Sequence, residues 1–257
     1  MYTDSKRRYK TIRLLGKGAF AEVYLVENDR RQAYACKVCT HEEILNREAG
    51  FQKEAGHPLF PQFYDFWREA WGACLLMEYV PGESLENMIR HKGRLSDVQA
   101  ARIGCRLAEG LSWIHEKEAP LLFRDIKPAN VMLTPAGEVK LLDFGCACRP
   151  GKCADRAGSI GFAAPEQFVP GAVQTPAADV YGLGRTLQEI TAGGCRGLLK
   201  KVTERCTADN PQERLWDMRE VRELLMFCTG KRGAGINPGQ RAVLGGKVRI
   251  IREICEY

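Results

Sequence analysis

The sequence has no apolar run of the 18 or more residues that a membrane-spanning helix needs. We also expect no secretory leader, because no apolar segment follows the polar stretch Met1–Lys6. No internal repeat or low-complexity segment is visible. Hydrophobic residues make up 45% of the chain and charged residues 27%, as in ordinary soluble globular proteins. These features predict a cytoplasmic protein with one large domain or two small lobes.

A disulfide framework is also absent from the pattern, since the 11 cysteines are odd in number and irregularly spaced. We therefore expect reduced thiols. Most of the net charge of +6 lies in residues 229–257, which hold six basic and two acidic residues. The rest of the chain is too weakly basic to indicate a nucleic-acid partner. This tail also has six glycines. It is either a basic arm that docks onto an acidic partner or a membrane surface, or a loose end.

Hydrophobic periodicity divides the rest into a strand-rich part, residues 1–80, and a mainly helical part, residues 81–228. Ser84 and Ser96 are predicted N-caps of two helices in the second part. Strands are predicted at 9–15, 22–26, 33–39, 62–67 and 73–80, and helices at 41–55, 84–90, 96–115, 176–190, 195–206 and 215–227.

A glycine-rich turn, Gly16-Lys17-Gly18-Ala19-Phe20-Ala21, lies between the first two predicted strands. Glycines in such a turn let backbone N–H groups approach phosphate oxygens closely. Ala21 replaces the third glycine of the usual pattern. A strand follows, whereas a dinucleotide-binding fold would place a helix there.

Lys37 lies in an otherwise apolar strand, Tyr34-Ala35-Cys36-Lys37-Val38. A lysine on the buried side of a strand needs an anion, which the phosphates of ATP and a carboxylate would supply. The candidate carboxylate is Glu48 on the following helix, with Glu43 as the alternative. A solvated strand lysine is the competing interpretation.

The most specific signal is the stretch Phe123-Arg124-Asp125-Ile126-Lys127-Pro128-Ala129-Asn130, followed by a short hairpin and Asp143-Phe144-Gly145. Phosphoryl transfer needs a group at the acceptor hydroxyl and oxygen ligands for Mg²⁺ at fixed spacing. Asp125, Asn130 and Asp143 supply these groups.

Together these motifs resemble the eukaryotic-type (Hanks-type) Ser/Thr protein kinases over about residues 9–228, in a style similar to compact bacterial members. The resemblance implies an α+β bilobal fold, with a small antiparallel-sheet N-lobe (residues 1–80) that has one main helix, a larger helical C-lobe (81–228), and an ATP cleft between them. It implies transfer of the γ-phosphate of Mg-ATP to Ser/Thr hydroxyls of a protein substrate.

The resemblance also implies roles for single residues. Asp125 would orient the substrate hydroxyl, Lys127 would meet the γ-phosphate, and Asn130 and Asp143 would bind magnesium. Met77 resembles the gatekeeper that precedes the adenine-contacting segment 78–80. The implied nucleotide-binding residues are Leu15, Gly16, Gly18, Val23, Ala35, Lys37, Glu48, Met77, Glu78, Val80 and Met132.

Three further expectations follow from the resemblance. Glu166 would form a salt bridge with Arg214, Asp179 would anchor the catalytic loop, and Ser159 stands where Ser/Thr kinases usually have threonine. From Gly193-Gly194 the chain goes almost directly to Leu198–Cys206 and Asp209-Asn210-Pro211, so the helix that the family usually has between these points is expected to be missing.

The sequence departs from the family pattern at several positions. Phe123 replaces a histidine, and Gln52 stands where an apolar residue normally packs on Phe144. Residues 146–157 contain no Ser, Thr or Tyr. Either Asp155 supplies a fixed carboxylate in place of a phosphate, so that activity needs no activation-loop phosphorylation, or it is simply solvated. Cys146, Cys148 and Cys153 are redox-sensitive thiols, part of a zinc site, or idle.

Two rival functions remain open. A pseudokinase would bind nucleotide and act as a scaffold, but the presence of Lys37, Asp125, Asn130 and Asp143 disfavours it. A small-molecule kinase of the aminoglycoside or choline type is disfavoured by Lys127 and by Ala164-Pro165-Glu166. The natural substrate and the oligomeric state are not encoded in any recognisable motif.

Overall fold

The computed structural model describes residues 9–18, 20–152, 157–192 and 194–230. These form two compact units. The first comprises the described residues up to Glu83 together with Met132–Ala147, and the second comprises Ser84–Val131 and the described residues from Cys148 onward. None of the helices in the described part of the chain has the length and hydrophobicity of a membrane span.

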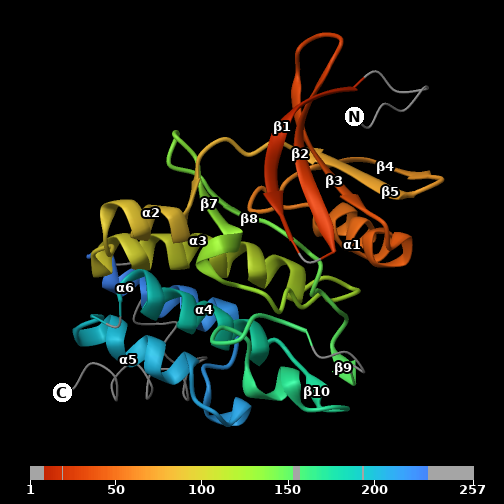
Figure 1. The fold of residues 1–257 in the computed structure, drawn as a ribbon. Coiled ribbons are helices and arrows are strands. Elements are labelled where there is room, and N and C mark those ends of the chain that lie inside the picture. Colours follow the sequence, from red (N-terminus) through yellow and green to blue (C-terminus); the bar gives the residue numbers. More distant parts are fainter. Residues whose placement is uncertain (1–8, 19, 153–156, 193, 231–257) are drawn as a thin grey trace. The chain divides into compact units, whose positions relative to one another are not determined.

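The first unit is built on a five-stranded antiparallel sheet with the strand order β1-β2-β3-β5-β4 (Figure 1). The glycine-rich turn joins its first two strands, and residues on either side of it pair, Gly16 with Val23 and Lys17 with Glu22. The strands span Tyr9–Lys17 (β1), Ala21–Asn28 (β2), Ala33–Cys39 (β3), Phe63–Glu69 (β4) and Gly72–Glu78 (β5).

The two faces of this sheet bury different apolar clusters, as the alternation of side chains along a strand requires. One cluster holds Cys36 with its neighbours Val38, Cys74 and Leu76. The other holds Cys39, which packs with α1 residues. Cys36 and Cys39 therefore lie in separate clusters on opposite faces of the sheet.

Helix α1 (Glu42–Ala55) covers the second cluster through Leu45 and Ala49. It ends at Gly56, whose left-handed φ of 57° suits a residue without a Cβ. Glu48 and Gln52 are buried on the same helix. A single helix thus brings one carboxylate to the sheet that carries Lys37.

Segment 132–147 belongs to the first unit, whereas the sequence division placed it in the second part. The cause is local bonding: the backbone N–H of Leu141 donates to the carbonyl of Leu59 at 2.8 Å. The short strands β6 (Glu83–Ser84), β7 (Val131–Leu133) and β8 (Val139–Leu141) form a sheet in that order.

The second unit is mainly helical, and its first helices start at the predicted caps. The Ser84 hydroxyl accepts a hydrogen bond from the N–H of Asn87, and Ser96 forms a capping box with Gln99. The helices span Leu85–Lys92 (α2), Asp97–His115 (α3), Ala177–Ile190 (α4), Gly197–Cys206 (α5) and Met218–Cys228 (α6), with 3₁₀ turns at Pro128–Asn130 (η1), Pro165–Phe168 (η2) and Pro211–Glu213 (η3) and a two-stranded sheet of β9 (Gly151–Lys152) and β10 (Val173–Gln174).

Helix α4 packs closely against α5 because Gly184 has no side chain. A Cβ at Gly184 would lie 2.6 Å from the Cβ of Cys206, which is closer than atoms can approach. Since α5 begins at Gly197, soon after α4 ends at Ile190, no further helix intervenes among the described residues 191–192 and 194–196. This agrees with the expected loss of a helix there.

Candidate functional site

The first unit holds Lys37 between two carboxylates. Its Nζ donates to Glu48 Oε1 at 2.7 Å and Oε2 at 2.8 Å, and to Asp143 Oδ1 at 2.8 Å. The side chains of Lys37 and Glu48 are 10% and 2% exposed. The structure therefore pairs Lys37 with Glu48, as predicted, and leaves the alternative, Glu43, exposed on the outer side of α1.

The pKa values of this trio follow from its burial and its charges. Burial raises the pKa of Glu48 to about 7, because loss of hydration outweighs the attraction of the Lys37 ammonium. Burial also opposes the charged form of Lys37, but the two carboxylates prevail and raise its pKa. Desolvation works to raise the pKa of Asp143, yet Lys37 and the N–H of Gly145 lower it overall. Of the two carboxylates that contact Lys37, Asp143 is therefore the one that stays ionised.

Asp143 has a strained backbone and an accessible side chain. Its φ of 78° lies in the left-handed region, which a non-glycine residue adopts only when its surroundings impose it. Lys37 and the N–H of Gly145, at 2.9 Å, both donate to Oδ1. The side chain is 46% exposed, so Oδ2 remains available to a ligand. A Cβ at Gly145 would lie 2.9 Å from Oδ1, which explains the glycine.

Phe144 is fully buried, and its ring contacts that of Phe60, whose centroid lies 5.0 Å away. Gln52 instead donates from Nε2 to the carbonyl of Pro61 at 3.0 Å. The polar residue at this helix position therefore fixes the backbone next to Phe60. Sequence reasoning identified Gln52 as unusual but missed Phe60.

Strand register places most of the expected nucleotide-binding residues on one face of the sheet. Val23 is directly opposite Lys37, and Ala35 is opposite Met77. Because directly paired residues and residues two apart share a face, these four side chains lie on the same side. The other expected residues lie at its ends or nearby: Leu15 and Gly16 at a bulge of β1, Gly18 in the turn, Glu78 and Val80 at and after the end of β5, and Met132 in β7.

The second unit carries Asp125, Lys127 and Asn130 on one loop. Asp125 is 7% exposed, and its Oδ2 accepts hydrogen bonds from Lys127 Nζ at 2.8 Å and Asn130 Nδ2 at 3.0 Å. Lys127 also donates to the Ser159 hydroxyl at 2.6 Å. Within the described residues, Asp125 Oδ1 is buried and has no hydrogen-bond partner. A buried acceptor of this kind is costly unless a ligand donates to it.

Asp179 of α4 anchors this loop, as expected. Its carboxylate accepts hydrogen bonds from the backbone N–H groups of Phe123 at 2.8 Å and Arg124 at 2.6 Å. The same carboxylate lies 2.7 Å from His115 Nε2. Arg124 has a left-handed φ of 65°, so the turn before Asp125 is strained and depends on these bonds.

Two further anchors were not anticipated. Thr186 of α4 donates to the carbonyl of Ile126 at 3.0 Å, and Gln167 Nε2 donates to the carbonyl of Arg124 at 2.9 Å. Both side chains are buried. Each has a charged residue before it, Glu166 or Arg185, so nothing in the local sequence distinguishes it as buried or indicates its partner.

Glu166 and Arg214 form the expected salt bridge in the second unit. Arg214 Nη1 and Nη2 contact the two carboxylate oxygens at 2.6 and 2.9 Å, and the Arg214 side chain is completely buried. This fork-to-fork geometry gives both strength and direction. It fixes the end of the activation segment to the loop before α6.

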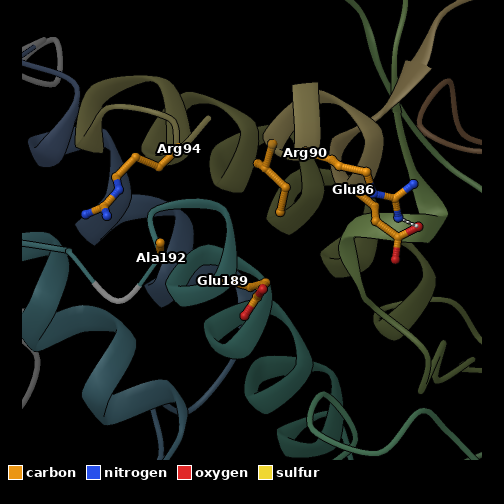
Figure 2. A pocket seen from close by; sticks show the side chains of 6 residues that line it. Glu86, Arg90, Arg94, Glu189 and Ala192 are labelled. Carbon is orange, nitrogen blue, oxygen red and sulfur yellow. Dashed lines mark ion pairs between the residues drawn. The ribbon is translucent and has the colours of Figure 1, made fainter. Parts of the chain in front are cut away.

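The second unit also has a pocket of about 300 Å³ on α2, α4 and the residues after each of them (Figure 2). Glu86 and Arg90, drawn with a dashed line, form an ion pair at 3.6 Å, while Arg94 and Glu189 add charges of both signs. An adenine ring needs mainly apolar walls. This pocket is therefore unsuited to bind the nucleotide base.

Several expectations fall outside the described residues. Asp155, Cys153 and the tail from Lys231 are not described, so the roles suggested for them stay predictions. Cys146 and Cys148 are half-buried and not in disulfides. Among the residues that the structure does describe, no group of three or more His, Cys, Asp or Glu side chains could hold a metal ion.

Comparison with known proteins places the chain in a family. Residues 9–216 match the model of the protein kinase domain. The chain is 30% identical to the human cAMP-dependent protein kinase catalytic subunit PRKX over 74% of this chain and 55% of that protein. It is 27% identical to the serine/threonine-protein kinase PrkC of Bacillus subtilis over 87% of this chain and 37% of that protein, and 34% identical to PknK of Mycobacterium bovis over 72% and 18%.

The matched region thus spans about half or less of these three relatives. It includes Lys37, Glu48, Asp125, Asn130 and Asp143. The antiparallel sheet with one main helix and the mainly helical second unit agree with the α+β architecture expected from the sequence. The chain therefore belongs to the protein kinase domain family, and the two bacterial relatives named above are serine/threonine-protein kinases.

Proposed function

We propose that the protein transfers the γ-phosphate of Mg-ATP to serine or threonine hydroxyls of protein substrates. The observation that carries the proposal is the buried, unpartnered Oδ1 of Asp125. An acceptor hydroxyl that donates a hydrogen bond to this oxygen would satisfy it and would be oriented for attack. A pseudokinase has no need to maintain such an oxygen.

The neighbours of Asp125 support this role. Lys127 and Asn130 both donate to Oδ2, so Oδ1 is the oxygen left for the substrate. The Lys127 ammonium, which lies 2.8 Å from Asp125 and 2.6 Å from Ser159, is positioned to stabilise negative charge close to the accepting group. Serine at position 159 thereby helps to fix the lysine.

Residues of the first unit would hold the nucleotide. Lys37, oriented by Glu48, would bind the α- and β-phosphates, and the sheet face with Val23, Ala35 and Met77 would contact the base. Asn130 Oδ1 and the accessible Oδ2 of Asp143 suit Mg²⁺, which prefers oxygen ligands. When bound, magnesium would neutralise charge on the phosphates.

Phosphate incorporation into casein from radiolabelled ATP tests the proposal. Wild type should label casein, and Asp143→Asn should abolish the labelling. Glu138→Gln, an exposed carboxylate on the hairpin just before Asp143, is the matched control and should keep full activity. Nucleotide binding without any transfer by the wild type would favour a scaffold, and transfer to small alcohols but not to casein would favour a small-molecule kinase.

We further propose that activity does not require phosphorylation of the activation segment. Residues 146–157 offer no hydroxyl acceptor, and Asp155 could supply a permanent negative charge instead. Phosphatase treatment should then leave the activity unchanged, whereas Asp155→Asn should lower it. Unchanged kinetics in Asp155→Asn would remove Asp155 from this role.

A further inference from the structure

An ion pair in the first unit joins Glu78, one of the residues expected to bind the nucleotide, to Lys140, which has so far been given no role. Lys140 Nζ donates to both carboxylate oxygens of Glu78, at 2.7 and 2.8 Å. The Lys140 side chain is 11% exposed and that of Glu78 is 30% exposed. Lysine in the middle of a short strand is rarely this buried without a specific partner.

Glu78 is held on a second side by the segment before β4. The N–H of Gln62 donates to Glu78 Oε2 at 3.0 Å, and the N–H of Glu78 donates to the carbonyl of Gln62 at 2.9 Å. The side chain and the backbone of Glu78 are therefore both fixed. Glu78 is also the last residue of β5 and the first of the segment proposed to contact adenine.

Lys140 connects Glu78 to the strand that leads to Asp143. It lies in the middle of β8, three residues before Asp143, and the next residue, Leu141, is bonded through its N–H to Leu59. Two successive residues of β8 are thus bonded to the rest of the first unit, Lys140 through its side chain to Glu78 and Leu141 through its backbone to Leu59. These bonds fix the end of β5 that is proposed to contact adenine relative to Asp143.

We propose that Lys140 is a positioning residue for nucleotide binding, which acts by holding the backbone at Glu78 in place. This inference rests on the proposed use of ATP. Replacing Lys140 with an apolar residue leaves a carboxylate that still accepts from Gln62 and reaches water, so the fold should survive. Replacing Glu78 instead leaves a buried ammonium without its partner, which is more disruptive.

The experiment compares full-length wild type with Lys140→Met, Lys140→Arg and Lys140→Gln. The control is Arg68→Met, which removes a cation paired with Glu42 on the exposed side of the same unit. Calorimetric titration gives the Kd of ADP with Mg²⁺ and the Kd of adenosine alone, at a temperature well below unfolding. Casein phosphorylation gives KM for ATP and kcat.

Lys140→Met should raise the Kd values of ADP and of adenosine by the same factor, about fivefold to tenfold, and should raise KM for ATP by that factor too. The kcat at saturating ATP should change less than twofold. The Kd values of Lys140→Arg should stay near those of wild type, and the Kd values of Lys140→Gln should lie between those of wild type and Lys140→Met. The control Arg68→Met should have the Kd values of wild type. A lower Tm with unchanged Kd values in both Met and Gln variants would show a merely structural role and overturn the inference. Failure of the wild type to bind ADP would instead refute the proposed function, and the inference with it.

Discussion

The raised pKa of Glu48 makes a quantitative prediction about stability. In the folded protein burial raises this pKa to about 7, whereas an unfolded glutamate titrates near 4.5. Below pH 4.5 the residue is protonated in both states and folding carries no ionisation penalty. As the pH rises, the unfolded state loses its proton first, so stability that is present at low pH is lost until the pH passes about 7.

The size of the effect follows from the two pKa values. One pKa unit corresponds to about 1.4 kcal/mol, so the full loss is about 3 kcal/mol, of which about 2 kcal/mol falls between pH 5 and pH 7.5. Glu48→Gln keeps the shape of the protonated side chain and cannot ionise. The free energy of unfolding of Glu48→Gln minus that of wild type should therefore rise by about 2 kcal/mol over this pH range.

Urea unfolding followed by tryptophan fluorescence measures this difference. Trp113→Phe and Trp216→Phe in every variant leave Trp67 and Trp71 to report on the first unit alone. The control is Glu43→Gln, since Glu43 is an exposed residue on the same helix. Its free energy of unfolding minus that of wild type should vary by less than about 0.5 kcal/mol over the same pH range. If the Glu48→Gln difference stays constant or falls as the pH rises, then attraction to Lys37 outweighs burial and our assignment is wrong.

Three further changes test the packing of the structure by urea unfolding. Glu166→Gln leaves the buried Arg214 guanidinium without its charge partner and should cost about 3–5 kcal/mol; a loss under 1 kcal/mol would show that Arg214 is rehydrated. Gly184→Ala puts a methyl group against Cys206 and should cost about 1–3 kcal/mol, and an unchanged midpoint would mean that α5 yields freely. Gly50→Ala, in the α1 interior with open space around the new Cβ, should instead stabilise by about 0.5–1 kcal/mol; destabilisation would mean that α1 is not helical at Gly50.

The elements of the fold were largely predictable because their signals are local. Ala33–Cys39 was predicted with the bounds that β3 has, and the Ser84 and Ser96 caps begin helices as expected. Each depends on a few neighbouring residues, such as a polar cap or an alternating strand. Helix α6 starts at Met218, three residues later than the predicted start at Leu215, because Asp217 provides its cap.

The contacts around the site were less predictable because they depend on partners far apart in the sequence. Lys37 with Glu48 was found because a family pattern links them. Lys140 carries no such pattern, and its partner Glu78 is 62 positions away. Phe60 likewise reads as an ordinary apolar residue. A sequence indicates that a buried charge needs a partner, but only the fold shows which one.

The division of the first unit into two stretches of sequence also has a consequence for how the chain folds during synthesis. Residues up to Glu83 cannot complete that unit alone, because β8, which contains Lys140, and Asp143, which comes after that strand, are synthesised only after the long helix α3. Until then, Glu78 and Lys37 each lack a partner that the finished unit provides. A fragment ending at Glu83 should therefore be a poor folding unit, and a split of the gene at that point should yield two pieces that need each other.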